Sequence, residues 1–583
     1  MSPRAWRPKS RRWRVAPAYS GADELARQIG SVPLVAQILH NRGIELPEAA
    51  RAFLNPKLDD LHPPEKLPGA TAAAERIARA VAEGQRIVIY GDYDVDGITA
   101  VAILHTCLTM LGADVHYYVP HRLEEGYGVN IEAIRKIISR GVRLLITVDC
   151  GIAAQEPIAE AVAAGVDVVV TDHHSPPEVL PPAFAIVHPA IPQGVYPDDG
   201  LAGAGVAFKL AWQLAKVACG NTRVDKQMRD FLLDATCLAA LGTIADVVPL
   251  VGENRVLAVY GLRALPATSH RGLRALLESA GLATGRLDAY HVGFVLAPRL
   301  NACGRMGHAR LAVELLTTAS EQRSRQIAGY LAQQNTERQK VEREITRQAV
   351  EMVSSQGMDE KSCRGIVLAS EAWHGGVIGI VASRLVDQFG RPTVLIAKNG
   401  TGCAQGSARS IPGFHMREAM AACSEHLISF GGHAMAGGMR IREEKIDEFT
   451  AAFLAYAARN LTDAQLESTL RIDAETTLSA MSYSVVEHIS RLAPFGEGNP
   501  RPVLAFRRCR LLVPPKRMGR SGQTVGLILG QNDARARAVG FGMGDLADHL
   551  VGIHQVDVAA EPVLNTFAGT TTVELKLHDI LWD

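Results

Sequence analysis

Short apolar runs alternate with helical patterns between about residues 85 and 190. The runs occupy residues 86–91, 115–120, 144–151, 167–174 and 185–189. The segments between them, such as ITAVAILHTCLTML and NIEAIRKIISRG, are rich in Ala, Ile and Leu. Continuous apolar strands that alternate with helices are typical of a parallel sheet covered on both faces. The pattern therefore predicts a doubly wound α/β domain.

Helical patterns dominate residues 200–350. The most apolar stretch, 231–251, contains Asp234 and Asp246, which favours a buried helix over a membrane span. The segment 321–353 has apolar residues at helical spacing near its end, while its middle, QQNTERQK, is polar all round. This pattern predicts a long, solvated helix that joins two domains.

Two further units follow this helix. Residues 364–440 contain the strand-like runs RGIVLAS and PTVLIAK and end in the glycine-rich FGGHAMAGGM, which indicates a second, smaller α/β unit. After a helical spacer near 446–470, the runs PVLAF, TVGLILG, ARAVGFG, VDVAAE and TTVELKL are separated by turns. Short strands at such intervals predict a small antiparallel barrel at the carboxyl end.

The length of 583 residues is too great for one core and suggests three or four domains. The expected boundaries are 1–45 for a basic arm and lead-in, 46–320 for the first α/β domain, 321–355 for the linking helix, 356–462 for the second α/β domain and 463–583 for the barrel. The first fourteen residues hold six basic and no acidic side chains, which we interpret as an unstructured arm. The alternative is a nucleic-acid contact in which Trp6 and Trp13 stack on bases.

Composition narrows the class of protein. The formal net charge is zero, so binding to a polyanion must rely on local basic clusters. The nine cysteines include no C-x-x-C pair, which indicates neither a zinc ribbon nor a disulfide framework and favours a reducing cytoplasm. No apolar segment follows the basic start, so we expect neither a secretory signal nor a membrane anchor.

Three of the predicted strands end in potential metal ligands. These are Asp92, Asp94 and Asp96 after the first strand, Asp149 after the third, and Asp172, His173 and His174 after the fourth. In an open parallel sheet, sites form at the carboxyl ends of the strands, so these groups are expected to meet. Asp246 is a further candidate, because a carboxylate in an apolar stretch needs a partner such as a cation.

The types of ligand restrict the choice of metal. Carboxylates with imidazole suit Mn²⁺, Mg²⁺ or Fe²⁺, and the absence of thiolates argues against structural zinc. So many anionic ligands favour two ions that share a bridging carboxylate.

Three other interpretations of these residues compete with a two-metal site. A calcium loop starting at Asp92 is excluded, because its twelfth position is Ile103 instead of a bidentate Glu. The sequence DVDGIT also resembles the nucleophile motif of haloacid-dehalogenase-type phosphatases, in which Asp94 would attack phosphorus; this stays a minor alternative. The groups could also be ordinary turn and cap residues, although three such clusters in register make that a weak explanation.

The same residues resemble a known family. The motifs DYDVDG, VDCG, DHH and ADVVPL, in this order, are similar to the four motifs of the DHH phosphoesterase superfamily. Further segments resemble the RecJ-type exonucleases within it: PHRLEEGYG, PRLNACGRMG, WHGGVIGIVASRL, GSARS, FGGHAMAGG and PFGEGNPRP. The resemblance covers about residues 30 to 583. It implies a doubly wound DHH domain, a linking helix, a DHHA1 domain and an oligonucleotide-binding (OB-like) barrel.

The resemblance also implies roles for individual residues. The metal ligands would be Asp92, Asp94, Asp96, Asp149, His173 and Asp246. The catalytic set would be Asp94, Asp96, Asp149, His173 and His174, with His174 beside the scissile phosphate. Asp172 would orient its neighbours. Tyr90 stands where many phosphatase members have a histidine ligand, and Asp92 would supply the missing group.

The implied reaction is hydrolysis of single-stranded DNA from its 5′ end to 5′-mononucleotides, with two Mn²⁺ or Mg²⁺ ions. Ions roughly 3.5–4 Å apart activate water and neutralise charge on both the attacking and the leaving oxygen. A protonated His174 would stabilise negative charge, and a neutral one would shuttle a proton; the sequence leaves both open.

Substrate contacts are implied for Arg122, Arg299, Asn301, Arg305, His374, Ser407, Arg409 and His433. Arg122, Ser407 and Arg409 would surround a terminal 5′ phosphate, because a guanidinium and a hydroxyl suit phosphate oxygens. The loop FGGH (430–433) would offer backbone N–H groups to phosphate. Trp373 is expected in the domain core.

The barrel carries a dense basic segment, RRCRLLVPPKRMGR (507–520), with six basic and no acidic side chains. We expect it to be either a contact for single strands or a solvated loop. Arg501, where relatives commonly have Glu, would add to this basic patch.

The expected partner is single-stranded DNA, with single-strand-binding protein and a RecQ-type helicase implied only through a role in recombination and repair. A cytoplasmic monomer is expected. The alternative function is a short-oligonucleotide or cyclic-dinucleotide phosphodiesterase, whose members usually lack the barrel. A non-enzymatic single-strand scaffold is disfavoured, because this chain retains the implied ligands.

Overall fold

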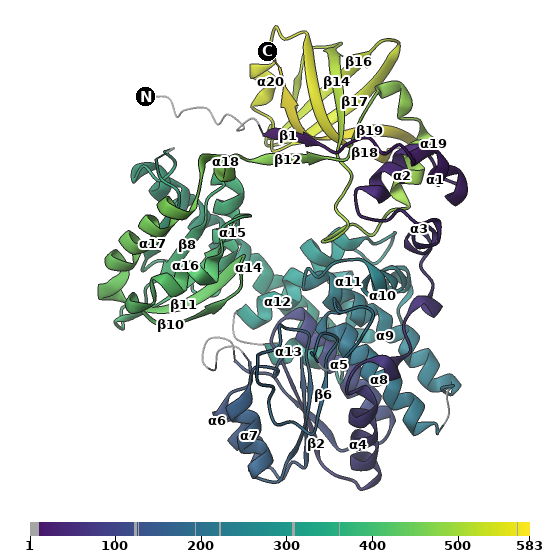
Figure 1. Cartoon of the computed structure of the whole chain (residues 1–583), viewed down its shortest axis with the longest axis vertical. Coiled ribbons are helices and arrows are strands. Elements are labelled where there is room, and N and C mark those ends of the chain that lie inside the picture. The colour runs from purple at the N-terminus through teal and green to yellow at the C-terminus, as the bar shows by residue number, and fades with distance from the viewer. Residues whose placement is uncertain are drawn as a thin grey trace.

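The computed structural model describes residues 11–121, 125, 128–192, 194–220, 223–305, 309–360, 362–567 and 569–582. The chain forms three domains, and a long helix, α14 (Glu321–Ser355), lies between the two α/β domains (Figure 1). The first α/β domain lies at the bottom of the view, the second α/β domain at the left, and the strand-rich domain at the top.

The first domain is built on a sheet of five strands in the order β3-β2-β4-β5-β6, and all its pairings are parallel. The strands are β2 (Ile87–Gly91), β3 (Val115–Tyr118), β4 (Leu144–Val148), β5 (Asp167–Thr171) and β6 (Ala185–Val187). Each of the five predicted runs forms one of these strands. The predicted doubly wound sheet is therefore confirmed.

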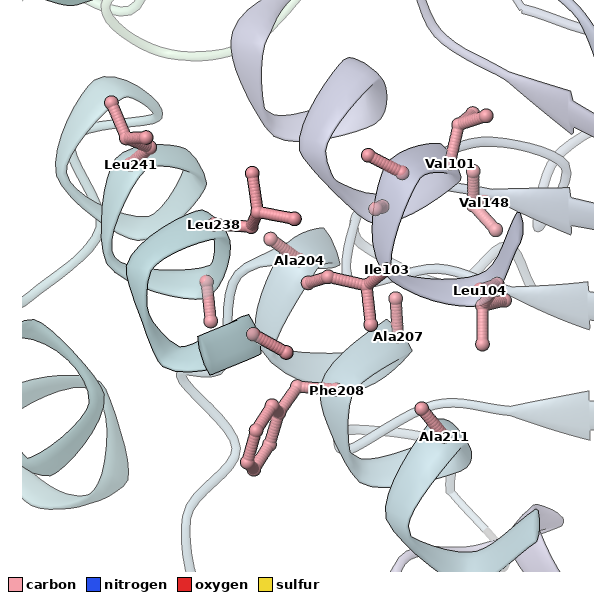
Figure 2. Packing of buried hydrophobic residues seen from close by; sticks show 14 of the residues in the cluster. Val101, Ile103, Leu104, Val148, Ala204, Ala207, Phe208, Ala211, Leu238 and Leu241 are labelled. Carbon is pink, nitrogen blue, oxygen red and sulfur yellow. The ribbon is translucent and has the colours of Figure 1, made fainter. Parts of the chain in front are cut away.

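Both faces of this sheet are covered because the strands are apolar on both sides. Ile87 and Ile89 point to a core made with helices α4 (Ala70–Ala82), α5 (Val95–Met110), α8 (Gly203–Ala218) and α9 (Lys226–Ala245). Figure 2 shows this layer, in which Ile103 of α5 meets Ala204 and Ala207 of α8 beside Leu238 of α9. On the opposite face, Val88 and Tyr90 pack against α6 (Ile131–Ile138) and α7 (Gln155–Ala163).

The helical half of the domain continues to the linking helix. It comprises α10 (Gly252–Ala264), α11 (Arg271–Ser279), the π-helix η4 (His291–Leu296), α12 (Ala297–Arg305) and α13 (Ala309–Leu315). The predicted buried helix is α9, which ends directly before Asp246.

The linking helix α14 has 35 residues and is therefore about 52 Å long. Its predicted solvated middle is confirmed on one side only, where Gln333, Thr336, Glu337 and Lys340 are exposed. Asn335, Arg338 and Glu342 are buried, and Glu342 forms ion pairs with Arg338 and with Arg384 of α15 (Ile378–Phe389). The polar residues therefore pair with one another across the contact between the linking helix and the second α/β domain.

The second α/β domain contains a five-stranded sheet in the order β10-β11-β9-β8-β7. Its strands are β7 (Ile366–Ser370), β8 (Thr393–Ala397), β9 (Cys403–Arg409), β10 (Leu427–Gly432) and β11 (Ala436–Arg442), with helices α15, α16 (Met416–Ala422) and α17 (Ile446–Asn460). The glycine-rich segment forms the β10–β11 hairpin rather than an open loop, and the His433 N–H donates to the carbonyl of Ala436. That backbone group is therefore not available to a phosphate.

The strand-rich domain has seven strands in the order β13-β14-β18-β19-β17-β16-β15, and an extra pairing of β14 with β16 closes the barrel. The strands are β13 (Ala474–Thr476), β14 (Leu504–Leu511), β15 (Lys516–Met518), β16 (Thr524–Gln531), β17 (Ala534–Phe541), β18 (Gln555–Phe567) and β19 (Thr570–Leu581). The helices α18 (Asp463–Leu466), α19 (Tyr483–Ser490) and α20 (Leu546–His549) accompany them. The five predicted strands of the barrel are all present, but β13–β14 and β17–β19 are parallel pairs, so the barrel is not wholly antiparallel as predicted.

The amino-terminal region belongs to this barrel. The strand β1 (Arg12–Val15) pairs in parallel with β12 (Thr469–Ile472), so the expected unstructured arm is wrong for these residues. Trp13 donates to Asp579 at 2.8 Å and lies under the guanidinium of Arg507, so its ring is not free for a base. Trp6 lies outside the described residues. The helices α1 (Ala22–Ile29), α2 (Pro33–His40) and α3 (Pro47–Leu54) bury apolar side chains in the barrel core.

Candidate metal centre

The carboxyl ends of β2, β4 and β5 carry the predicted ligands, and the order of the strands makes these ends neighbours. Asp94 is the amino-terminal cap of α5, where its carboxylate accepts the Gly97 N–H at 3.1 Å. Asp149 directly follows β4, and one residue, Asp172, separates His173 from the end of β5. Asp246 reaches the same place from the carboxyl end of α9.

His173 lies at the centre of the cluster. Its Nε2 atom is 3.2 Å from Asp149 Oδ1, 3.5 Å from Asp246 Oδ2 and 3.8 Å from Asp96 Oδ2. Residues that are up to 150 positions apart in the sequence therefore meet within one small volume. In the part of the chain that the structure describes, ligand atoms of Asp96, His173 and Asp246 lie within 4.8 Å of one another.

A second triad adjoins the first. Ligand atoms of Asp92, Asp94 and Asp149 also lie within 4.8 Å of one another. Asp149 belongs to this triad, and its Oδ1 also lies 3.2 Å from His173 Nε2, so it lies between the two groups. This arrangement suits two cations that share the carboxylate of Asp149.

Burial and like charge raise the pKa values of the carboxyl groups. Burial, followed by the charge of Asp94, raises the pKa of Asp96 to about 7. Burial and the charge of Asp96 raise the pKa of Asp246 to about 8 and that of Asp149 well above its usual range. For His173, burial and the neighbouring His174 lower the pKa to about 4, so its imidazole is neutral and able to bind a metal.

The residues fit a divalent cation. Asp149 Oδ1 and His173 Nε2 are buried atoms that make no hydrogen bond within the described chain. Leaving such atoms unsatisfied is costly, and a cation satisfies both. The backbone of Asp149 has φ 58°, a left-handed conformation that Asp tolerates better than most residues and that directs its side chain into the cluster.

Asp172 has a different role from its neighbours. Its carboxylate accepts hydrogen bonds from the N–H groups of Ile152 and His174, at 2.9 and 3.1 Å, and contacts the His174 ring at 2.7 Å. Burial of the His174 ring opposes protonation, but the hydrogen bond and charge of Asp172 outweigh it and raise the pKa of His174 to about 9. Asp172 therefore orients the His174 ring and stabilises its protonated form.

Sequence reasoning missed the residues that hold Asp96 in place. The backbone N–H groups of Gly203 and Ala204, at the start of α8, donate to the two oxygens of Asp96 at 2.6 and 2.9 Å. A Cβ atom on Gly203 would lie 2.6 Å from Asp149 Oδ1, and one on Gly242 would lie 2.4 Å from Asp96 Oδ1. The available signal was the run LAGAG, in which small residues precede an apolar helix.

In the second α/β domain, Ser407 and Arg409 lie beside each other on β9, and Arg409 Nη1 donates to Ser407 Oγ at 3.2 Å. Both approach Gly379 in the first turn of α15, where an added Cβ would lie 2.8 Å from Ser407 Oγ. A hydroxyl and a guanidinium at the beginning of a helix form a suitable site for a phosphate.

The structure places the other predicted substrate contacts as follows. His374 precedes α15, and its Nδ1 accepts the Gly376 N–H at 3.1 Å. His433 lies at the turn of the β10–β11 hairpin. Trp373 is in the core, as expected, and donates to Gln348 of α14 at 2.9 Å.

On α12, Arg299 donates to the Val295 carbonyl at 2.5 Å, and burial lowers its pKa. Asn301 lines a cavity of about 530 Å³ between α12, α14 and α15. Arg122 and the side chain of Arg305 lie outside the described residues.

The basic segment of the barrel is partly neutralised. Arg507 pairs with Glu475 and Asp557, and Arg517 pairs with Asp545 and Asp548.

Arg501 does not add to that patch, contrary to expectation. It forms ion pairs with Asp288 of the first domain at 3.2 Å and with Glu561 of β18 at 2.8 Å, and so connects the two domains.

None of the helices that the structure describes combines the length and apolar character needed to cross a bilayer.

Three family comparisons match separate parts of the chain. The DHH family amino-terminal domain matches residues 86–239, the DHHA1 domain matches 363–459, and the RecJ OB domain matches 472–579.

Whole-chain relatives agree with these matches. The single-stranded-DNA-specific exonuclease RecJ of Bacillus subtilis is 38% identical over 97% of this chain and 70% of its own length. The enzyme of the same name from Haemophilus influenzae is 34% identical over 95% of this chain and 97% of its own. The crystal structure of RecJ from Thermus thermophilus in complex with Mn²⁺ has a TM-score of 0.83 and 32% identity, covering 98% of this chain and 80% of that one. The chain therefore belongs to the RecJ family of single-stranded-DNA-specific exonucleases, within the DHH superfamily.

Proposed function

We propose that this protein is a 5′→3′ exonuclease that hydrolyses single-stranded DNA to 5′-mononucleotides with Mn²⁺ or Mg²⁺. The observation that carries the proposal is the convergence of Asp96, Asp149, His173 and Asp246 on one rim, with Asp92 and Asp94 adjoining. Family membership supports the substrate, and the metals named for Thermus thermophilus RecJ, Mn²⁺ and Mg²⁺, support the cofactors.

The two triads would hold two ions. Asp92, Asp94 and Asp149 would bind one ion, and Asp96, His173 and Asp246 would bind the other, with Asp149 facing both. When bound, such a pair activates water and neutralises charge on the attacking and leaving oxygens. The chain contributes a fixed geometry, because backbone N–H groups already hold Asp96 and the left-handed backbone fixes Asp149.

His174 would act on the scissile phosphate as a cation. Its pKa of about 9 keeps the ring protonated at neutral pH, and Asp172 occupies the Nδ1 side. A protonated ring beside the scissile phosphate would stabilise the negative charge that grows on its oxygens in the transition state. The ion pair with Asp172 supports this role over proton transfer.

The direction of hydrolysis would follow from a phosphate site in the second α/β domain. Ser407 and Arg409 would bind the terminal 5′ phosphate at the beginning of α15 and so place the first internucleotide bond at the metal rim. Arg122, His374 and His433 would contribute to the same region, and Arg299, Asn301 and Arg305 would contact the strand further along. These assignments, and the domain boundaries drawn from the sequence, remain proposals.

The barrel favours an exonuclease over a phosphodiesterase of short oligonucleotides, because it offers a surface for the remainder of the strand. A monomeric state, a cytoplasmic location and work alongside single-strand-binding protein and a RecQ-type helicase in recombination and repair belong to the same proposal.

The test is Asp149→Ala, assayed with 5′-labelled oligonucleotides in Mn²⁺. We expect strand binding to persist and turnover to fall by about three orders of magnitude or more, because both triads lose their shared carboxylate. Near-normal turnover would remove Asp149 from the centre. Cleavage of dinucleotides alone by the wild-type protein would contradict the exonuclease.

A further inference from the structure

Asp246 is held less firmly by its surroundings than the other carboxylate of its triad. Its side chain is 23% exposed, whereas that of Asp96 is fully buried. Two backbone N–H groups hold the carboxylate of Asp96. Within the described part of the chain, the carboxylate of Asp246 has one polar partner, the His173 ring at 3.5 Å. The direction in which Asp246 points therefore depends on the backbone that carries it.

The backbone directly after Asp246 is strained. Val247 has φ 63°, a left-handed conformation that is an outlier for a β-branched residue. Its side chain is 64% exposed, so packing of this side chain does not compensate for the strain. Strain of this kind persists where the surrounding structure imposes it. The turn at Val247 is therefore fixed by the segments at its two ends, which are α9 and residues 249–251.

The second of these anchors is supplied by the barrel domain, through the loop of residues 494–501 (loop 494–501). The Leu250 N–H donates to the carbonyl of Glu497 at 2.8 Å. Gly498 has φ 69° and lies so close to the first domain that an added Cβ would be 3.0 Å from Pro249. Leu250 is itself buried in the core of the first domain. The loop therefore fixes the far end of the strained turn.

Loop 494–501 is suited to transmit the position of the barrel. Asn499 is fully buried, and its side chain donates to two backbone carbonyls of the same segment at 2.8 Å each, which keeps the loop in one shape. Arg501 ties the end of the loop to Asp288 of the first domain and to Glu561 of the barrel. A displacement of the barrel is thus passed to the turn that carries the metal ligand.

We propose that loop 494–501 positions Asp246, and that the placement of the barrel thereby sets the affinity of one metal site. That site is the triad of Asp96, His173 and Asp246. The loop acts through the backbone of residues 247–250 and contacts neither metal nor substrate in this role. This inference rests on the proposed function, because that function assigns the triad to one of two ions. The barrel would then contribute to metal loading as well as to strand binding.

The first test compares Gly498→Ala with the matched control Gly519→Ala. Both glycines have a left-handed backbone, with φ of 69° and 79°, so both variants carry the same kind of backbone strain. A Cβ added at Gly519, between β15 and β16, would meet no other atom of the described chain within 4 Å. In calorimetric titration of Mn²⁺ into chelator-treated protein, Gly498→Ala should raise the Kd of one binding step by about tenfold, and the control should not. An unchanged Kd in Gly498→Ala would overturn the proposal.

A double-variant comparison separates positioning from a general loss of structure. Asp246→Asn alters the group through which the loop is proposed to act, so Gly498→Ala should change the Kd for Mn²⁺ by less than about twofold in that background. The same tenfold effect with and without Asp246 would overturn the proposal.

A second variant keeps the test available should Gly498→Ala fail to fold. Arg501→Ala frees one end of the loop but keeps the hydrogen bond between Leu250 and Glu497. It should raise the same Kd by about threefold, and wild-type affinity in this variant would count against the proposal.

Hydrolysis gives a further readout. At a Mn²⁺ concentration near the wild-type Kd, a tenfold rise in Kd lowers occupancy of the site by about fivefold, so kcat of Gly498→Ala on a 20-nucleotide strand should fall by about that factor. KM for the strand should stay within about twofold, and Mn²⁺ at about 100 times the wild-type Kd should restore kcat. A loss of kcat that Mn²⁺ does not restore would contradict positioning through the metal site.

The two proposals fail in different ways. If the exonuclease assignment is wrong, the wild-type protein releases no mononucleotides, while the calorimetric comparison needs no substrate and still reports on loop 494–501.

Discussion

Metal binding should expel protons from the acidic cluster. Burial and mutual repulsion raise the pKa of Asp96 to about 7 and that of Asp246 to about 8, and the pKa of Asp149 is also strongly raised. At pH 7, a carboxyl group with a pKa of about 8 carries about 0.9 proton and one with a pKa of about 7 carries about 0.5. Asp96 and Asp246 together therefore hold about 1.4 protons in the metal-free cluster at pH 7, which Mn²⁺ must displace because it binds only the ionised groups. Any proton held by Asp149, whose pKa is also raised, adds to this number.

The assay is isothermal titration of Mn²⁺ into chelator-treated protein at pH 7, in two buffers that differ in ionisation enthalpy. The difference in observed heat, divided by the difference in ionisation enthalpy, gives the number of protons released. We expect at least about 1.4 at pH 7, which is the share of Asp96 and Asp246, and this share should fall towards about 0.3 at pH 8.5.

The matched variant is Asp246→Asn, which removes one titrating group and one repulsive charge. It should release about one proton fewer at pH 7 than the wild type. Equal heats in the two buffers would mean that the carboxyl groups are already ionised without metal. That result would refute the reasoning from burial and repulsion.

Further predictions concern residues around the cluster. In metal-free protein, the pKa of His174 is raised from 6.5 to about 9, so the protonated ring stabilises the fold fully below pH 6.5, and this stabilisation is lost as the pH rises through about 9. Asp172→Asn should flatten this part of the plot of melting temperature against pH. An unchanged plot would contradict the role of Asp172. Gly203→Ala should raise the Kd for Mn²⁺ by about tenfold or more, because the new Cβ would crowd Asp149. Wild-type affinity, measured by calorimetry, would show that metal binding does not require glycine at this position. Arg255→Ala should lower the free energy of unfolding by about 3 kcal/mol, measured by urea denaturation, because its buried guanidinium donates to carbonyls of Phe53, Leu492 and Ala493; a change below about 1 kcal/mol would contradict this.

Hydrophobic periodicity predicted the helices and strands that form from a short, continuous run of sequence with a clear apolar pattern. The five parallel strands, the linking helix and the strands of the barrel all follow from runs of fewer than forty residues. The pairing of Arg12 with Thr469 could not be predicted in this way, because a four-residue strand carries too little pattern to specify a partner hundreds of residues away. The burial of one side of α14 was missed for a similar reason, since Arg384, which pairs with Glu342 in addition to Arg338, lies on another helix.

In the candidate site, too, local sequence patterns predicted some features, whereas others depend on contacts between distant residues. That Asp94, Asp149 and His173 follow adjacent strands was visible in the sequence, because strand ends in a parallel sheet meet at one edge. The family resemblance already set Asp172 apart from the ligands, but the physical reason, the hydrogen bonds that occupy its oxygens, was not visible in the sequence. The sequence also could not reveal that backbone N–H groups at Gly203 hold Asp96.

The joint construction of the barrel from both ends of the chain has a consequence for biosynthesis. The apolar faces of α1, α2 and α3 leave the ribosome well before the strands that bury them, which are made more than 400 residues later. At 5–20 residues per second, these faces stay uncovered for roughly 20 to 80 seconds. During that interval the two α/β domains can fold, while the first helices depend on chaperones or on transient contacts to avoid aggregation.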